Sequence, residues 1–298
     1  MFVLAHLSDP HLASRPRLGE LAGKRGLGFI NWQRKRKRIH RPEVLAAITH
    51  DLTACAAEHI AVTGDLVNLS LPAEYRKAQA WLETLGKPRD VTVVPGNHDV
   101  YVRGVEQYPN EFWGDYMRGD DGLHRFPFVR RRGNVALIAL STGLPTAPLL
   151  ATGRLGDRQL SRFAEALDQT HGLFRIVLIH HPPASPLRRY LRRLVDAAAL
   201  RQVLAAKGAE LLLHGHDHRR SLIWLDGPQQ AIPAVGVPSA SAQAAHGDED
   251  AAGYNLFSID GEVGHWHCQL IARQRGLDGA MREVERRDLI IAGPTAAA

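Results

Sequence analysis

Five short polar clusters, rich in aspartate and histidine, each stand directly after a short apolar run of the chain. They are Asp9-Pro10-His11, Gly64-Asp65, Gly96-Asn97-His98-Asp99, His180-His181 and Gly215-His216-Asp217-His218. Carboxylate, imidazole and amide oxygen are ligands that suit Mn, Fe, Zn or Co, and the absence of cysteine sets the clusters apart from a structural zinc finger. The clusters hold more ligands than one ion can use. Two ions about 3.5–4 Å apart, bridged by one carboxylate, would use them all.

The elements that must position these clusters are repeated β-loop-α units, because aliphatic and β-branched runs alternate with stretches of helical periodicity. The expected strands are Phe2–Ser8, His59–Thr63, Val91–Pro95, Val135–Ser141, Phe174–His180 and Glu210–His214. The expected helices are Pro42–Glu58, Pro72–Leu85, Gln107–Met117, Asp157–Gln169 and Pro186–Ala206. Loops at the carboxyl ends of strands in an α/β sheet converge on one edge, so the five clusters are expected to form one site.

After His218 the sequence pattern changes to short, hairpin-like strands separated by the turn dipeptides Asp226-Gly227 and Asp260-Gly261. The expected strands here are Ser221–Leu225, Gln229–Val237, Tyr254–Ile259, Val263–Arg273 and Val284–Ile291. We expect residues 1–292 to form a single domain, with a basic insertion at 15–41, and residues 293–298 to be a frayed tail.

The order of the clusters, DxH, GD, GNHD, H and GHxH, resembles that of the calcineurin-like metallophosphoesterase superfamily, with all five blocks between Asp9 and His218. The fold that this resemblance implies is a four-layer αββα sandwich, in which the late hairpins would supply the second sheet. The short chain and the sequence His180-His181-Pro182-Pro183 are most similar to the subgroup of bacterial cyclic-nucleotide and glycerophosphodiester phosphodiesterases. The resemblance therefore implies a metal-dependent phosphodiesterase that acts on a small phosphodiester.

The same resemblance implies a role for each matching residue. The first metal ion would be bound by Asp9, His11 and His218, the second by Asn97, His180 and His216, and Asp65 would bridge both. Of the adjacent histidines, His180 is preferred as the ligand because it comes first after an apolar run, while His181 is expected to contact substrate or to support a ligand. Manganese or iron is the expected metal, with zinc and cobalt as alternatives.

Phosphoester cleavage needs a nucleophile at neutral pH, neutralisation of charge on the phosphoryl oxygens, and a proton for the leaving group. A hydroxide bridging two ions would supply the nucleophile, because metal coordination lowers the pKa of water from about 15.7 towards neutrality. His98 is not a ligand in the family pattern and would be the general acid, with Asp99 orienting its other ring nitrogen. The alternative for Asp99 is a loop cap that holds the backbone.

The net charge of +6 is concentrated in the basic segment, which we define as residues 15–41 and which holds ten Lys and Arg against one Glu. Within it, five consecutive cations, Arg34–Arg38, follow Phe29, Ile30 and Trp32. Such a run could dock on anionic lipid, bind a nucleic-acid backbone, hold a second phosphate over the site, or be a solvated loop. The remainder of the chain is net acidic, which disfavours a nuclease.

A second basic element is expected at 186–198, as a helix with apolar and basic faces. Leu187, Tyr190, Leu191, Leu194 and Val195 would share the apolar face, opposite Arg188, Arg189, Arg192 and Arg193. The expected contacts to an anionic substrate or membrane surface are His181, Arg34, Arg36, Arg38, Arg189 and Arg192.

Two cysteines, Cys55 and Cys268, are too few for a disulfide framework, which favours a reducing compartment. The start has no basic leader and no apolar run is long enough to span a membrane, so a cytoplasmic protein is expected, with attachment to the inner membrane face as the alternative. The alternative function is accordingly a membrane-surface lipid phosphohydrolase, such as a nucleotide-diacylglucosamine pyrophosphatase. A non-catalytic scaffold is disfavoured because no ligand of the pattern is lost.

Overall fold

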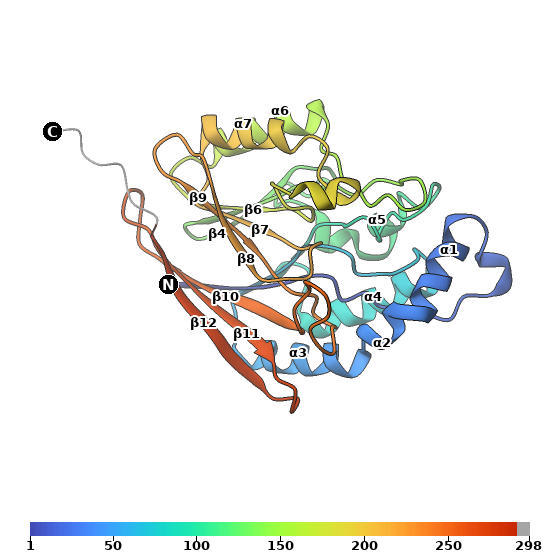
Figure 1. The fold of residues 1–298 in the computed structure, drawn as a ribbon. Helices are drawn as coiled ribbons and strands as arrows, with labels where there is room; N and C mark the ends of the chain where they lie inside the picture. The colour runs from blue at the N-terminus through green and yellow to red at the C-terminus, as the bar shows by residue number, and fades with distance from the viewer. Residues whose placement is uncertain (291–298) are drawn as a thin grey trace.

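The computed structural model describes residues 1–290, apart from the side chains of Lys35, Arg36, Arg188 and Ile290. Two six-stranded mixed sheets face each other at the centre of the molecule (Figure 1). The first sheet has the order β12 (Met281–Ile290), β11 (His267–Arg275), β10 (Gly253–Asp260), β1 (Phe2–Leu7), β2 (His59–Val62) and β3 (Val91–Val93). The second has the order β4 (Phe128–Arg132), β5 (Val135–Ala139), β6 (Phe174–Leu178), β7 (Leu211–His214), β9 (Ile232–Gly236) and β8 (Ser221–Leu225).

Helices cover the outer faces of both sheets (Figure 1). On one side lie α3 (Pro42–Ala54) and α4 (Pro72–Leu85), and on the other α6 (Asp157–Gln169) and α7 (Ala197–Lys207). The shorter helical elements are η1 (Leu18–Glu20), α1 (Lys24–Asn31), the π-helix η2 (Trp32–Arg36), α2 (Lys37–Ile39), α5 (Tyr108–Trp113), η3 (Gly114–Met117) and η4 (Leu187–Arg192). This arrangement confirms the expected four-layer αββα fold.

The inner strands β5, β6 and β7 of the second sheet are buried on both faces because they separate two apolar cores. In β6, Ile176 and Leu178 point into the core between the sheets, whereas Val177 points into the core beneath α6 and α7. The same alternation runs through β5 and β7. Parallel strands buried in this way read as continuous apolar runs, which is why the sequence marks them clearly.

The late strands are divided between the two sheets, so the expectation that they form the second sheet is wrong. β10 pairs antiparallel with β1 and extends the first sheet, while β9 pairs parallel with β7 in the second. β4 was also missed by the sequence patterns because three arginines occupy its five positions. Arg130 is nevertheless buried there, and its guanidinium donates to the carbonyls of Pro88, Val91, Asp115 and Arg118.

The expected helix at 186–206, with its basic face at 186–198, is not continuous. It is divided into η4 and α7 by extended backbone at Arg193. The carbonyls of Leu191 and Arg193 accept hydrogen bonds from Ala151 and Gly153, so this stretch pairs with a neighbouring loop instead of continuing a helix. Leu187 and Leu191 are therefore exposed, and Leu194 alone of the expected apolar face is buried.

The basic segment is mostly helical, which the sequence patterns did not predict, since it contains α1, η2 and α2. Arg25 fastens α1 to the core by donating to the carbonyls of Leu69 and Ser70. At the other end, Arg41 N–H donates to the carbonyl of Ser241 at 2.9 Å. Within residues 1–290, no helix has both the length and the apolar character needed to cross a bilayer. The expected tail at 293–298 lies outside the described residues.

Candidate metal centre

Five of the predicted ligands have left-handed backbone conformations, with positive φ angles that residues other than glycine rarely adopt. These are Asp9, His11, Asp65, His216 and His218, with φ between 46° and 68°. Each such conformation costs about 1–2 kcal/mol, so the surrounding fold must hold the loops in place. Gly64 shows how tightly they pack, because a Cβ atom there would lie 2.6 Å from the Gly96 nitrogen and 2.8 Å from His180. The strain is concentrated where the polar clusters follow their strands.

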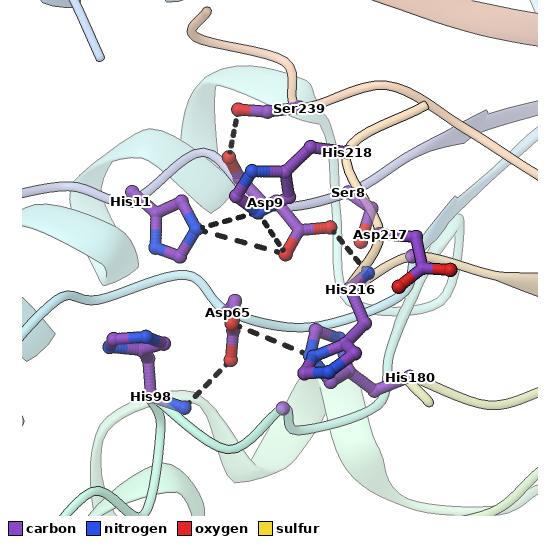
Figure 2. A network of polar contacts seen from close by, with 12 residues as sticks. Ser8, Asp9, His11, Asp65, His98, His180, His216, Asp217, His218 and Ser239 are labelled. Carbon is purple, nitrogen blue, oxygen red and sulfur yellow. Dashed lines mark hydrogen bonds and ion pairs between the residues drawn. The ribbon is translucent and has the colours of Figure 1, made fainter. Parts of the chain in front are cut away.

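The first group of donor atoms is formed by Asp9, His11 and His218 (Figure 2). The Nε2 atoms of the two histidines are 3.1 Å apart, and Asp9 Oδ1 lies 3.1 Å from His218 Nε2 and 3.8 Å from His11 Nε2. All three side chains are buried.

The second group of donor atoms is formed by Asn97, His180 and His216. His180 Nε2 lies 3.3 Å from Asn97 Oδ1 and 3.2 Å from His216 Nδ1. Asp65 Oδ2 is 3.4 Å from the same His180 atom, and a carboxylate oxygen of Asp65 also lies within 4.8 Å of a ring nitrogen of His11. Asp65 therefore stands between the two groups (Figure 2).

Each histidine of the two groups is oriented by its outer ring nitrogen. His180 Nδ1 donates to the carbonyl of Thr63 at 2.6 Å, and His216 Nε2 to that of Arg192 at 2.8 Å. His218 Nδ1 lies 2.9 Å from the Glu249 carboxylate, and His11 Nδ1 is 3.4 Å from the carbonyl of Val67. Such partners fix the tautomer and direct the inner nitrogen at the centre.

The charges within the centre shift several pKa values. Burial alone would lower the pKa of His180 and His218, but Asp65 raises the first to about 9, and Asp9 with Glu249 raises the second to about 9. Burial and the neighbouring His181 and His180 hold the pKa of His216 well below its usual value. Although burial opposes ionisation of Asp65, the adjacent His180 and His98 hold its pKa below its usual range.

These donor sets fit two transition-metal ions. Two ligands of one ion lie about 3 Å apart when the metal–ligand bonds are about 2.1 Å long. The carboxylate and imidazole atoms of each group have separations of this size. His11 Nε2 and His218 Nε2 face each other in a buried site beside the Asp9 carboxylate. A cation between them would bind both nitrogens. The two groups share Asp65, as a dinuclear site requires.

His98 lies beside Asp65 and lines the cavity over the centre. Its backbone N–H donates to Asp65 Oδ1 at 2.7 Å, and its Nδ1 donates to the carbonyl of Asn68 at 2.6 Å. Its ring stacks on that of Tyr101, with centroids 5.1 Å apart and planes at 7°.

The expectation that Asp99 orients His98 is wrong. The Asp99 carboxylate accepts the backbone N–H groups of Gly96 at 2.8 Å and Val67 at 3.1 Å, so it holds the loop that carries Asn97 and His98. Burial, together with the charge of Asp65, raises the pKa of Asp99 to about 7. Asn68 has the orienting role instead, because its backbone carbonyl accepts the hydrogen bond from His98 Nδ1.

A cavity of about 600 Å³ opens above the centre. Its floor includes Asp65, Asn97, His98, His216 and His218, and its walls include Lys24, Leu27 and Ile39 of the basic segment. Arg192, an expected substrate contact, also lines this cavity. The basic segment thus forms one wall of the site.

The other expected contacts lie elsewhere. His181 is buried, with Nδ1 bonded to Thr142 Oγ1 and Nε2 to the Ala151 carbonyl, so it does not line the cavity. Its ring lies against those of His216 and His180, with centroids 4.3 and 5.0 Å apart, as the alternative role of supporting a ligand requires. Arg189 is also buried and pairs with Asp217 and Asp248, because η4 turns it inward, so its assignment to an exposed basic face is wrong. Arg34 and Arg38 are exposed outside the cavity lining, and the Arg36 side chain lies outside the described residues.

Two residues of the centre were missed in the sequence. Glu249, from the loop before β10, contacts the outer nitrogen of His218, and His40, at the end of the basic segment, brings a ring nitrogen within 4.8 Å of those of His11 and His218. Neither follows a strand, and neither belongs to the five clusters. The available signal for His40 was its position in the basic segment, which begins shortly after the first cluster.

The two-sheet fold and the paired donor groups are those expected of a metallophosphoesterase, and the comparison with known families agrees. The pattern of the calcineurin-like phosphoesterases matches residues 2–220, so the chain belongs to this family. Enzymes of the family are hydrolases of phosphoesters, and typically bind two metal ions.

Among curated proteins, the chain is similar to a cAMP/cGMP dual specificity phosphodiesterase of Mycobacterium tuberculosis (strain CDC 1551 / Oshkosh). The two are 27% identical over 227 residues, which cover 73% of this chain and 62% of that protein. Among solved structures, a purple acid phosphatase from yellow lupin (Lupinus luteus) seeds superposes with a TM-score of 0.58 at 12% identity, covering 95% of this chain and 52% of the other. The chain thus spans less than two thirds of either protein, and the second likeness concerns the fold alone.

Proposed function

We propose that this protein is a dinuclear metal-dependent phosphodiesterase that hydrolyses a small phosphodiester. The observation that carries the proposal is the placement of Asp65 between two donor groups, with His98 beside it on the floor of the same cavity. A cavity of about 600 Å³ is within the usual range for a small-molecule site. The distant relative described as a cyclic-nucleotide phosphodiesterase supports a diester, in particular a cyclic nucleotide.

The metal ions, when bound, would supply an activated water and neutralise charge on the phosphoryl oxygens. Asp9, His11 and His218 would hold one ion, Asn97, His180 and His216 the other, and Asp65 would bridge them. The outer-nitrogen hydrogen bonds keep these imidazoles in one tautomer and limit their rotation.

His98 would protonate the leaving-group oxygen. Its Nδ1–H is committed to the Asn68 carbonyl, so the Nε2 position is the one that can deliver a proton towards the cavity. Stacking on Tyr101 limits rotation of the ring, and the bond from the His98 backbone to Asp65 ties the acid to the bridging carboxylate. Asp99 secures the same loop through Gly96 and Val67.

Hydrolysis of bis(p-nitrophenyl) phosphate and p-nitrophenyl phosphate by metal-loaded protein tests this function. We expect the diester to be cleaved faster than the monoester. In a second assay, we expect the protein to hydrolyse cyclic nucleotides. Faster cleavage of the monoester would make the protein a phosphatase.

A second candidate function, hydrolysis of a lipid phosphoester at a membrane surface, is supported by the rim of the cavity. Leu149 is 90% exposed and Leu27 56% exposed, and both line the cavity. Lys24 Nζ donates to Thr146 Oγ1 at 2.9 Å, so α1 adjoins the loop that carries Leu149. Leu27 lies on the same basic segment as the exposed cations Arg34 and Arg38, and apolar side chains beside cations suit an anionic lipid surface.

A further inference from the structure

We propose that His40, supplied by the basic segment, is an additional protein ligand of the metal ion held by Asp9, His11 and His218. His40 lies outside the five clusters that carry the resemblance to the family. The inference rests on the proposed metal centre but not on the identity of its substrate.

The position of the His40 ring fits such a ligand. One of its nitrogens lies within 4.8 Å of the donor nitrogens of His11 and His218, which are themselves 3.1 Å apart. The ring centroid is 4.5 Å from that of His11 and 5.6 Å from that of His218, both in edge-to-face orientation. For metal–nitrogen bonds of about 2.1 Å, two ligand atoms lie between about 3 Å and about 4 Å apart, so the His40 nitrogen is at most about 1 Å beyond the spacing of two ligands.

His40 is also oriented in the same way as the four predicted histidine ligands. Its Nδ1 shares a hydrogen bond with Ser241 Oγ at 2.9 Å, which directs Nε2 to the opposite side of the ring. Ser239, two residues before Ser241, donates from its hydroxyl to the Asp9 carbonyl at 2.6 Å. One loop therefore holds both His40 and the strained Asp9 turn.

The backbone on either side of His40 is fixed to that loop. Gln243 N–H donates to the Ile39 carbonyl at 2.8 Å, and Arg41 N–H donates to the Ser241 carbonyl at 2.9 Å. Because these bonds bracket His40, its imidazole is brought to the centre by the backbone and not by a flexible side chain alone.

The proposal gives the basic segment a chemical link to the metal centre. The segment forms one wall of the cavity and ends in a residue that would coordinate the ion on its floor. Metal binding would then stabilise the wall as well as the floor. A third imidazole would also favour iron, cobalt or zinc over the harder ions magnesium and calcium.

Metal titration tests the proposal without reference to catalysis. Four proteins are freed of metal with a chelator and titrated with Mn²⁺ by calorimetry: wild type, His40→Ala, Ser241→Ala and the control His50→Gln. The control alters an exposed histidine on α3. We expect His40→Ala to weaken one of the two sites at least about 10-fold and to spare the other. Ser241→Ala should weaken the same site by a smaller factor, and the control should match the wild type.

Cobalt substitution gives a second measurement of the same contact. Removing a nitrogen ligand lowers the coordination number, so the visible Co²⁺ bands of His40→Ala should change position and intensity relative to the wild type. Circular dichroism checks that the variant is folded, and Ser241→Ala provides the test if it is not.

Unchanged Mn²⁺ affinities and Co²⁺ bands would overturn the proposal. A higher KM with wild-type metal binding would instead make His40 a substrate contact. Failure of the wild type to cleave diesters while binding two ions would refute the proposed function and leave this inference standing.

Discussion

The carboxylate of Glu249 lies 2.9 Å from His218 Nδ1, on the side of the ring that faces away from the centre. Because a carboxylate can only accept, Nδ1 of His218 carries a hydrogen, and the ring is turned so that Nε2 faces Asp9. The pair therefore resembles the carboxylate–histidine arrangements that orient metal ligands in other proteins.

Replacing this carboxylate should weaken one metal site. We expect Glu249→Gln to lower the affinity for the ion held by His218 by about 10–100-fold, because the ring loses its orienting partner and some basicity. Competition with a metallochromic chelator measures the loss. Glu283→Gln, on an exposed part of β12, is the control, and equal affinities in the two variants would refute the role of Glu249.

His98→Ala should retain both metal ions and lose rate. The loss should be greatest for diesters with poor leaving groups, because these depend most on protonation of the departing oxygen. A series of aryl phosphodiesters of increasing leaving-group pKa measures this dependence. A variant that has lost its metal ions would contradict the assignment of His98 as the acid.

Asp99→Asn distinguishes a loop cap from an orienting group. Because Asp99 accepts two backbone N–H groups, whereas the His98 ring donates from Nδ1 to Asn68, we expect a lower melting temperature and a uniform loss of rate across leaving groups. A leaving-group dependence like that of His98→Ala would restore the orienting role.

Replacing Arg34–Arg38 with glutamine should separate the two candidate functions. No proposed ligand or acid is altered, so cleavage of a small diester should be nearly unchanged. If the segment docks on lipid, binding to phosphatidylserine vesicles should weaken by about 1 kcal/mol per cation, and wild-type binding should fall as salt rises. Wild-type vesicle binding by the variant would exclude electrostatic docking through this run.

His59 should make stability depend on pH. Burial, with the charges of Arg132 and Arg130, lowers its pKa to about 3. In the unfolded chain it titrates near 6.5, so between these values the unfolded state binds more protons and stability falls as the pH falls. The His59 contribution is about 1.4 kcal/mol per pH unit below 6.5. Urea unfolding of wild type and His59→Gln from pH 7.5 to 5 should show a shallower dependence in the variant, and equal slopes would contradict the shift.

The sequence predicts the central strands and their polar ends well, because apolar runs such as Phe174–Leu178 are buried on both faces. It does not predict which sheet the late strands join, because this depends on long-range pairing, of β10 with β1 and of β9 with β7. Arg189 was misplaced for a related reason. Helical periodicity suggests an exposed face, whereas pairing of residues 191–195 with a distant loop turns Arg189 inward to Asp217.

In the site, too, some residues can be predicted from local sequence patterns and others depend on long-range contacts. The five clusters mark the donor groups because each ligand follows a strand, and strand ends meet at one edge. Glu249 and His40 come from loops whose approach to the centre depends on contacts with His218 and Ser241, which no local pattern records.

Metal content is the most direct test of the central claim that Asp65 joins two metal sites. Elemental analysis of wild-type protein, equilibrated with excess Mn²⁺ and then desalted, should give close to two ions per chain. Asp65→Ala should lose both, because its carboxylate lies against both donor groups. Glu43→Gln, an exposed change on α3, should retain them. Two ions retained by Asp65→Ala, or a single ion in the wild type, would contradict a dinuclear centre bridged by this residue.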